Sequence, residues 1–110
     1  MKVYISGPIT GLEKDDYMEN FKRAQELIEA AGCKAINPAA VNERLPEGTT
    51  HEEYMEMSIT MMDMCDAIYL LKGWEESTGA TIEFMHAIKR KMIIIFQKQN
   101  DVFEIVRDMK

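Results

Sequence analysis

The chain has 110 residues, and its 46% hydrophobic and 29% charged residues are the balance of one globular domain spanning residues 1–110. The net charge of −6, from 13 basic and 19 acidic residues, argues against binding a nucleic-acid polymer or an anionic membrane, because both need a basic face. A small anionic ligand is still compatible, because backbone N–H groups at a helix N-terminus can hold it without a cation.

The hydrophobic pattern alternates between two periods along the chain. Short apolar runs of β-forming residues, each followed by turn-forming residues, predict strands. Longer segments in which apolar residues recur every three or four positions predict amphipathic helices. In chain order, we expect a strand at 3–5, a helix at 15–31, a weak strand at 34–36, a long loop at 39–50, a helix at about 50–64, a strand at 67–71, a loop at 73–79, a helix at 79–90, a strand at 92–96 and a short closing helix at 101–109.

This alternation of strands and helices predicts an α/β fold. Parallel strands joined through helices need right-handed crossovers, and such crossovers place helices on both faces of the sheet. The strand at 92–96 is nearly all apolar, as strands covered on both faces are. We therefore expect a parallel sheet with helices on both sides.

Two glycine-rich loops are predicted to form the candidate site. In an open parallel sheet, ligands bind outside the carboxyl ends of the strands, near the switch in strand order. The loops at 6–14 and 73–79 follow two of the predicted strands and are expected to meet there. A plain tight turn is the alternative explanation of the first loop. That loop lacks a dinucleotide fingerprint and a P-loop lysine. The residues expected to bind the ligand are Ser6, Gly7, Pro8, Ile9, Thr10, Gly11, Asn37, Gly73, Trp74, Ser77, Gly79 and Ala80.

The helix predicted at 79–90 carries the strongest chemical candidate. Ser77 or Thr78 is a good helix cap, and the free N–H groups after it form an anion site. Glu83 follows about one turn inside the helix, where the positive helix end favours an ionised carboxylate. A carboxylate that faces a sugar ring can attack the anomeric carbon, and a solvated surface glutamate is the alternative.

Three other side chains are candidates for the same site. Tyr4 can hydrogen-bond Glu83, and both Tyr4 and Trp74 can stack against a base, although a strand tyrosine also suits a core. His86 lies three residues after Glu83 and can share its helix face, from which it would orient the carboxylate. A surface histidine is the alternative.

The cysteines and the remaining patterns bound the cellular setting. Cys33 and Cys65 are far apart and match no metal-ligand spacing, so we expect both to be small core residues. No His, Cys and carboxylate cluster has ligand spacing, and the sequence predicts neither a metal nor a cofactor. Neither a signal peptide nor a membrane span is visible, which predicts a reduced, cytoplasmic protein.

Several segments, taken together and in order, resemble one family. The chain closely resembles the DUF4406 family, which is common in phages and prophages, over nearly its whole length. More distantly, it looks like the nucleoside 2-deoxyribosyltransferases and the 2'-deoxynucleoside 5'-phosphate N-hydrolases. The matching segments are MKVYISGPITG at 1–11, NP at 37–38, CDAIYLL at 65–71, GWEES at 73–77, GA at 79–80 and Glu83.

The resemblance implies a flavodoxin-like three-layer sandwich with four or five parallel strands and a glycosyl-enzyme mechanism. Glu83 matches the nucleophile that attacks the anomeric carbon, and Tyr4 matches a tyrosine that positions it. Ser77 matches a phosphate-binding serine of the hydrolases, where the transferases carry an aspartate. The loop Gly7–Gly11 matches a loop whose backbone contacts phosphate. These relatives assemble so that a neighbour completes the site, which predicts a homo-oligomer.

Two departures from the relatives keep other functions open. Thr10 stands where the hydrolases carry a phosphate-binding arginine. Ser58 and Ile59 stand where the relatives carry an aspartate that serves as the acid or contacts the substrate. Asp63 is the candidate to replace that aspartate, from a different turn of the same helix.

The sequence therefore predicts an N-glycosidase or deoxyribosyltransferase acting on a nucleoside or nucleoside 5'-monophosphate, with Glu83, Tyr4 and Asp63 as catalytic candidates. One alternative is a nucleotide-binding protein without turnover, such as a phage factor that sequesters a host nucleotide signal, because losing the acid would not abolish binding. Another is a protein-interaction scaffold that uses the methionine-rich helix at 50–64 as its contact.

Overall fold

Four parallel strands and four α-helices make up the part of the chain, residues 1–97, that the computed structural model describes. The predicted α/β class is confirmed, and the helix expected at 101–109 lies outside the described residues. The elements are β1 (Lys2–Ser6), α1 (Lys14–Ala30), β2 (Lys34–Ile36), α2 (Pro38–Asn42), α3 (His51–Met62), β3 (Ala67–Leu70), the short 3₁₀ helix η1 (Trp74–Glu76), α4 (Thr78–Lys89) and β4 (Ile93–Phe96).

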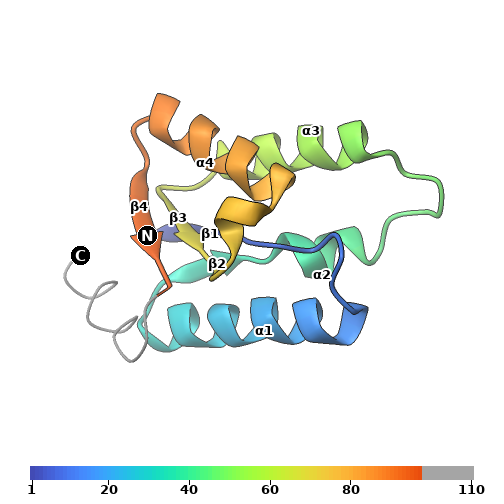
Figure 1. Ribbon diagram of the computed structural model, residues 1–110. Helices are drawn as coiled ribbons and strands as arrows, with labels where there is room; N and C mark the ends of the chain where they lie inside the picture. The colour runs from blue at the N-terminus through green and yellow to red at the C-terminus, as the bar shows by residue number, and fades with distance from the viewer. Residues whose placement is uncertain (98–110) are drawn as a thin grey trace.

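The sheet has the strand order β2-β1-β3-β4, with every neighbouring pair parallel. Tyr4 of β1 lies in register with Ile36 of β2 on one side and with Ile68 of β3 on the other. Helix α1 lies on one side of the sheet, and α3 and α4 lie on the other (Figure 1). This arrangement is consistent with a flavodoxin-like sandwich. The strand order switches direction between β1 and β3, which is where a ligand crevice is expected.

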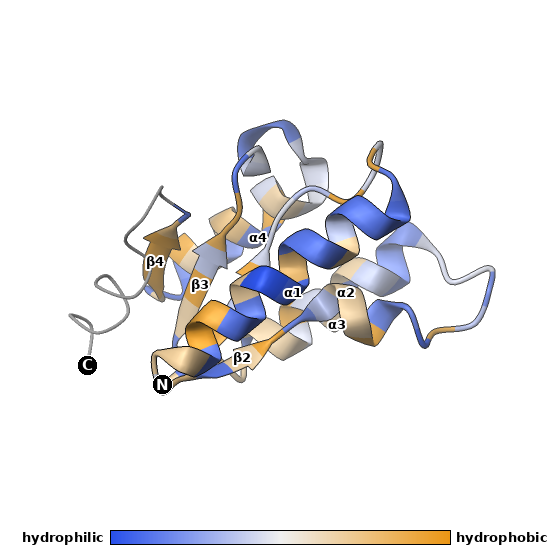
Figure 2. Ribbon diagram, turned by 90° about the horizontal axis from the view of Figure 1, so that it is seen from below, coloured by the Kyte–Doolittle hydropathy of each residue, from blue (hydrophilic) through white to orange (hydrophobic). Residues whose placement is uncertain are grey.

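Side chains of β1 alternate between two hydrophobic cores. Val3 and Ile5 pack on the α1 side of the sheet, while Tyr4 belongs to the core shared with α3 and α4. Figure 2 shows the hydrophobic strands inside and the hydrophilic residues of α1 turned outward. Because side chains alternate along a strand, Ser6 projects to the same side as Tyr4. The strand thus presents two hydroxyl groups toward α4.

Helix α4 begins at a serine cap and buries a narrow face of small residues. The Ser77 side chain accepts a hydrogen bond from the Ala80 backbone N–H at 3.2 Å, which satisfies one of the free donors of the first turn. Ala80, Glu83 and Ala87 are the buried residues of the helix, spaced three and four positions apart. The two alanines let the helix lie close to the sheet, and Glu83 lies on that same buried face.

The predicted loop at 39–50 is partly helical, which corrects the sequence-based expectation. Helix α2 runs over Pro38–Asn42, with proline at its first turn and Asn37 as its cap. The Asn37 side chain accepts a hydrogen bond from the Ala40 backbone N–H at 3.2 Å. A helix of five residues is too short for a repeating hydrophobic pattern, so periodicity does not reveal it.

Candidate functional site

The carboxylate of Glu83 is held by two hydroxyl groups of β1. The Tyr4 Oη donates a hydrogen bond to Glu83 Oε2 at 2.6 Å, and the Ser6 Oγ donates to Oε1 at 2.6 Å. Tyr4 is fully buried, and Glu83 is only 7% exposed. Glu83 is therefore not a solvated surface residue, and its carboxylate orientation is determined by the sheet.

Burial dominates the electrostatics of this carboxylate. Loss of solvent raises the pKa of Glu83 above its ordinary value, although the hydroxyls of Ser6, Tyr4 and Ser58 counter that rise. The expectation that the helix end would favour the ionised form does not hold. Glu83 lies beyond the first turn of α4, where the helix dipole has little effect. Burial and the neighbouring Glu83 charge also raise the pKa of Tyr4 well above its usual value, so Tyr4 remains a proton donor.

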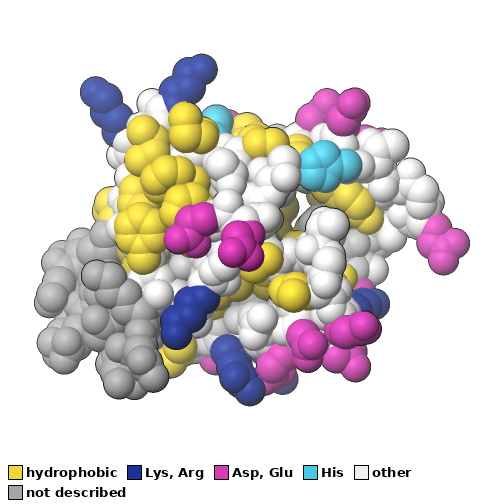
Figure 3. All heavy atoms as spheres, viewed as in Figure 1, with side chains coloured by type: hydrophobic (Ala, Val, Ile, Leu, Met, Phe, Trp, Pro, Cys, Tyr) yellow, Lys and Arg dark blue, Asp and Glu magenta, His cyan; other side chains and the backbone are white. Residues whose placement is uncertain are grey.

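A cavity of about 560 Å³ opens onto Glu83. Its size lies within the range of roughly 300–1,000 Å³ that is typical of small-molecule sites. In the space-filling view, the surface is hollowed between the region of α3 and α4 and the region of α1 and α2 (Figure 3). The lining residues are Gly7, Ile9, Thr10, Lys14, Tyr17, Ala39, Asn42, Glu43, Leu45, Pro46, Glu47, His51, Tyr54, Met55, Ser58, Ser77, Gly79, Ala80 and Glu83.

A second cavity of about 710 Å³ adjoins the first between the loops that follow β1 and β3. Thr10, His51, Ser77 and Gly79 line both cavities, so a ligand that contacts Glu83 has room to extend outward along these loops. Lys72 lies on the wall of the outer cavity. The crevice therefore follows the switch in strand order, as expected for an open parallel sheet.

Most of the sequence-predicted binding residues meet at these two cavities. Ser6 lies beneath the inner cavity, where it contacts the Glu83 carboxylate. The predicted residues that line the inner cavity are Gly7, Ile9, Thr10, Ser77, Gly79 and Ala80, and those that line only the outer one are Pro8, Gly11 and Gly73.

Asn37 and Trp74 have structural partners and line neither cavity. Beyond capping α2, Asn37 donates a hydrogen bond from Nδ2 to Gln25 Oε1 at 3.1 Å. Trp74 packs against Phe84, with 4.6 Å between ring centroids, and lies near Phe96. The ring of Trp74 is thus part of an aromatic cluster between the end of β3, α4 and β4.

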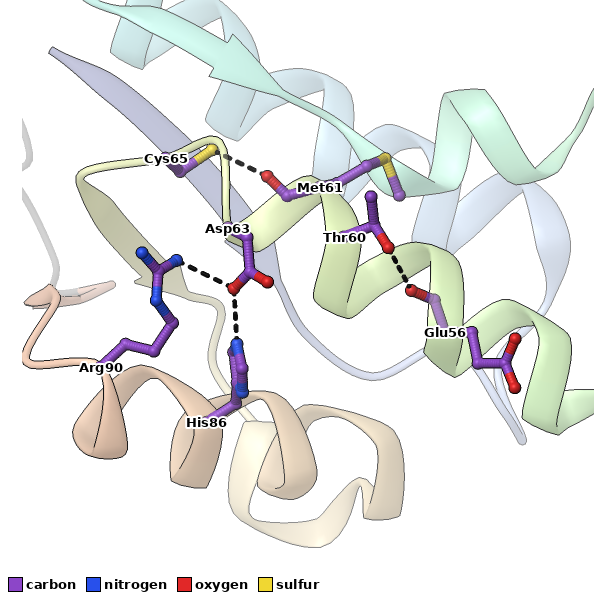
Figure 4. A network of polar contacts seen from close by, with 7 residues as sticks. All are labelled: Glu56, Thr60, Met61, Asp63, Cys65, His86 and Arg90. Atoms are coloured by element: carbon purple, nitrogen blue, oxygen red, sulfur yellow. Dashed lines mark hydrogen bonds and ion pairs between the residues drawn. The ribbon is translucent and has the colours of Figure 1, made fainter.

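Asp63 follows the last turn of α3, where it links that helix to α4. Its Oδ1 lies 2.8 Å from His86 Nε2 and 2.8 Å from an Arg90 guanidinium nitrogen (Figure 4). The hydrogen bond from His86, with help from Arg90, lowers the pKa of Asp63. Asp63 does not line the Glu83 cavity, and His86 contacts Asp63 instead of orienting Glu83.

Ser58 is a site residue that the sequence analysis named only as a departure from the relatives' aspartate and did not choose as a candidate. It is 5% exposed, lies on α3 and lines the cavity beside Glu83. Hydrogen bonding by the Ser58 hydroxyl lowers the pKa of Tyr4 and the pKa of Glu83, against the effect of burial. A signal was present in the sequence, because Ser58 lies four residues after Tyr54 and four before Met62, which places it on the inner stripe of the helix.

The cavity wall is acidic. Glu43, Glu47 and Glu83 contribute carboxylates, and the Nζ of Lys14 lies 3.3 Å from a carboxylate oxygen of Glu43. Among residues 1–97, no group of three or more His, Cys, Asp or Glu side chains is arranged to hold a metal ion. The arrangement can therefore supply a nucleophilic carboxylate, hydroxyl donors and hydrogen-bond acceptors.

The family to which the chain belongs is shown by its sequence pattern. The family described as a domain of unknown function, DUF4406, matches residues 1–96. The chain belongs to the DUF4406 family. This DUF4406 domain includes every helix and strand described above, and with them the Tyr4, Ser6 and Glu83 cluster. No curated protein matches the chain.

Proposed function

We propose that the protein is an N-glycosidase or deoxyribosyltransferase that acts on a nucleoside or nucleoside 5'-monophosphate through Glu83. The observation that carries this proposal is the buried Glu83 carboxylate, fixed by Tyr4 and Ser6 at 2.6 Å each and facing a cavity of about 560 Å³. Each carboxylate oxygen has two lone-pair positions, so a hydrogen-bonded oxygen can still attack a carbon.

The reaction has two displacements at the sugar. First, a Glu83 oxygen bonds to the anomeric carbon as the bond from that carbon to the base nitrogen breaks, and the bonding electrons leave with the base, which takes up a proton. Water, or the nitrogen of a second base, then attacks the same carbon, gives up a proton that balances the one taken up by the first base, and releases the carboxylate. Water gives hydrolysis, and a second base gives transfer. Tyr4 and Ser6 hold the carboxylate throughout.

The resemblance to the nucleoside 2-deoxyribosyltransferases and the nucleotide hydrolases supports the same roles. Glu83 and Tyr4 match the nucleophile and its positioning tyrosine in those enzymes, and their contact in this chain agrees with that match. Ser77 corresponds to a phosphate-binding serine, and it lines both cavities. Its hydroxyl can donate to a ligand while its oxygen caps α4.

A nucleotide-binding protein without turnover is the second candidate. Asp63, the proposed replacement acid, is bonded to His86 and Arg90 and lies outside the cavity wall. General acid catalysis contributes a factor of about 10²–10⁴, so a site without it can retain binding while losing most of its turnover. The raised pKa of Glu83 also reduces the fraction of ionised nucleophile.

Base release decides between the two candidates. The purified protein is incubated with a panel of nucleosides and 5'-monophosphates, and free base is measured by chromatography. We expect base from the wild type and from Glu26→Gln, an exposed control on α1, but none from Glu83→Gln. Asp63→Asn tests the acid assignment, since a loss of about 10²–10⁴-fold in turnover without a fall in melting temperature would favour Asp63 as the acid, whereas a loss of both would reflect its link between α3 and α4.

Two other outcomes would contradict the glycosidic proposal. Thermal stabilisation by one panel member without any free base would favour the binding protein. If no panel member gave free base or thermal stabilisation, that result would favour a protein-interaction scaffold that uses α3.

We further propose that the protein is a cytoplasmic homo-oligomer. Cys33 and Cys65 are free and buried, as a reduced compartment allows. Burial raises the pKa of Cys65 to about 11, which makes its thiol unreactive. Among the described residues, no helix is both long and apolar enough to cross a membrane.

The outer face of α4 exposes the apolar side chains Ile82, Met85 and Ile88, and we assign this surface to self-association.

A further inference from the structure

One acceptor atom on the wall of the Glu83 cavity has no hydrogen-bond partner. Asn42 Oδ1 is shut off from solvent, and within residues 1–97 it is the only buried side-chain nitrogen or oxygen atom without a partner. Asn42 is the last residue of α2 and lines the cavity. Buried polar groups in folded proteins are nearly always paired, so an exception at a binding site calls for a functional explanation.

The surroundings of Asn42 are rich in acceptors. Glu43 and Glu47 line the same part of the cavity, and both offer carboxylate oxygens. The nearby cation, Lys14, lies 3.3 Å from Glu43 and is therefore already engaged. A ligand group placed here meets more acceptors than donors, so it is held best when it brings N–H groups.

The same cavity is also lined by aromatic and aliphatic side chains. Tyr17, Leu45, Pro46 and Tyr54 line it, and aromatic and aliphatic surfaces of this kind cover the faces of a heterocycle. Glu83 lines the same cavity and is the residue assigned to the sugar. We therefore place the base of a nucleoside whose anomeric carbon faces Glu83 against the ring and aliphatic side chains of this cavity.

We infer that Asn42 selects bases that carry an exocyclic amino group over their keto counterparts. This inference rests on the proposed function. An amino group brings two N–H donors on one atom, which suits a cluster of acceptors, whereas a keto oxygen would face the oxygens of Asn42, Glu43 and Glu47. Because Oδ1 is closed to solvent in the free protein, this recognition requires the amide to rotate about its terminal torsion, which is broad in asparagine, so that Oδ1 faces the ligand. The bound base then satisfies the acceptor that the free protein leaves unpaired.

Binding of matched nucleoside pairs tests the inference. Adenosine and inosine, and likewise cytidine and uridine, differ in an amino against a keto group. The keto member also carries one N–H donor on the neighbouring ring nitrogen, so the comparison is of two exocyclic N–H donors against one ring N–H donor. Dissociation constants are measured by calorimetry in the Glu83→Gln background, which prevents turnover. We expect the amino member of each pair to bind at least about tenfold more tightly, the discrimination that one unpaired polar group typically imposes.

Two substitutions locate the selectivity at Asn42. Asn42→Asp keeps an acceptor and should keep the preference, whereas Asn42→Leu has a similar volume and should bring the ratio within each pair close to one. Asn42→Leu should also unfold at the same or a higher temperature without ligand, because it removes an unpaired buried acceptor. That result would separate a ligand-recognition role from a structural one.

Equal affinities in the wild-type asparagine context, or a preference that survives Asn42→Leu, would overturn the inference and leave the glycosidic proposal standing. If neither these nucleosides nor their 5'-monophosphates bound, and the base-release panel gave no free base, both would fail. The base-release assay separates these cases independently, since it reports turnover whichever base is preferred.

Discussion

At the scale of single residues, the site depends on a balance at Glu83. Burial favours the neutral acid, while the hydrogen bonds from Tyr4 and Ser6 favour the carboxylate. Burial prevails, so the pKa of Glu83 is raised in the folded protein. Among residues 1–97 no cation pairs with this buried carboxylate, so its charge weakens the fold at neutral pH, and perturbed groups of this kind are common where a residue serves function.

This balance predicts a pH-dependent effect of Glu83→Gln on stability. A carboxyl group with a raised folded pKa stabilises the fold below its unfolded pKa, and that contribution is lost as pH rises through the folded value. The neutral glutamine suffers no such loss. We therefore expect the melting temperature of Glu83→Gln, relative to that of the wild type, to increase as pH rises above the ordinary glutamate pKa of 4.5.

Glu53→Gln is a control with the opposite sign. Glu53 completes the capping box of α3, and its hydrogen bonds with Thr50 lower its pKa. The stability that the ionised Glu53 contributes is therefore lost as pH falls. The melting temperature of Glu53→Gln, relative to that of the wild type, should decrease as pH rises. Thermal melts between acidic and neutral pH measure both differences. A Glu83→Gln difference that is independent of pH would contradict the raised pKa.

At the scale of elements, the end of β1 and the end of β3 lie unusually close. A Cβ built on Gly7 would lie 2.7 Å from Leu71 Cβ, closer than side chains approach one another. Because these two strand ends form the crevice, glycine at this position is required by packing as well as by access to a ligand.

Gly7→Ala should destabilise the protein by about 1–3 kcal/mol, the usual cost of forcing an extra methyl group into a packed region. Gly79→Ala is the matched control from the same cavity wall, because its Cβ would meet only Met55 Sδ at 3.6 Å and alanine favours the helix. Urea denaturation measures both. Equal stabilities for the two variants would mean that β1 and β3 separate more easily than their contact suggests.

At the scale of the whole molecule, the outer face of α4 exposes three large hydrophobic side chains to solvent. Ile82, Met85 and Ile88 are 44%, 61% and 49% exposed. In Figure 3, hydrophobic side chains gather on the α4 and β4 side of the face in view. Lys89 ends this helix, and Glu75 precedes it, so opposite charges lie at its two ends.

We propose that a second copy of the chain covers this face. In a two-fold dimer, antiparallel α4 helices would bury the apolar residues and bring the basic end of each helix to the acidic end of the other. We expect a dimer by sedimentation velocity, and a monomer for the double variant Met85→Glu, Ile88→Glu. Val41→Glu, which changes an exposed apolar residue on α2, should leave the dimer intact. A wild-type monomer at all concentrations would refute the oligomer.

Local patterns predicted the α/β class and the four strands, but not every helix. The apolar runs at 3–5 and 67–71 form the central strands. A short run of β-forming residues that ends in turn residues is too short for a helix, so a buried strand is the structure it favours. The helix of Pro38–Asn42 escaped prediction because five residues are too few to show a period. The roles of Trp74 and Asp63 also needed the structure, since their partners come from distant segments.

For the site, the sequence by itself determined that the loops after β1 and β3 meet at one edge of the sheet, and it singled out Glu83 and Tyr4. The meeting of the loops depends on chain order and topology, which local periodicity encodes, whereas the roles of Glu83 and Tyr4 came from the resemblance to the transferases and hydrolases. Only the tertiary structure decided that Ser6 and Ser58 surround the carboxylate, that Asp63 lies outside the cavity and that Asn42 Oδ1 is unpaired. Burial and pairing are properties of packed segments far apart in the chain, so no local pattern can specify them.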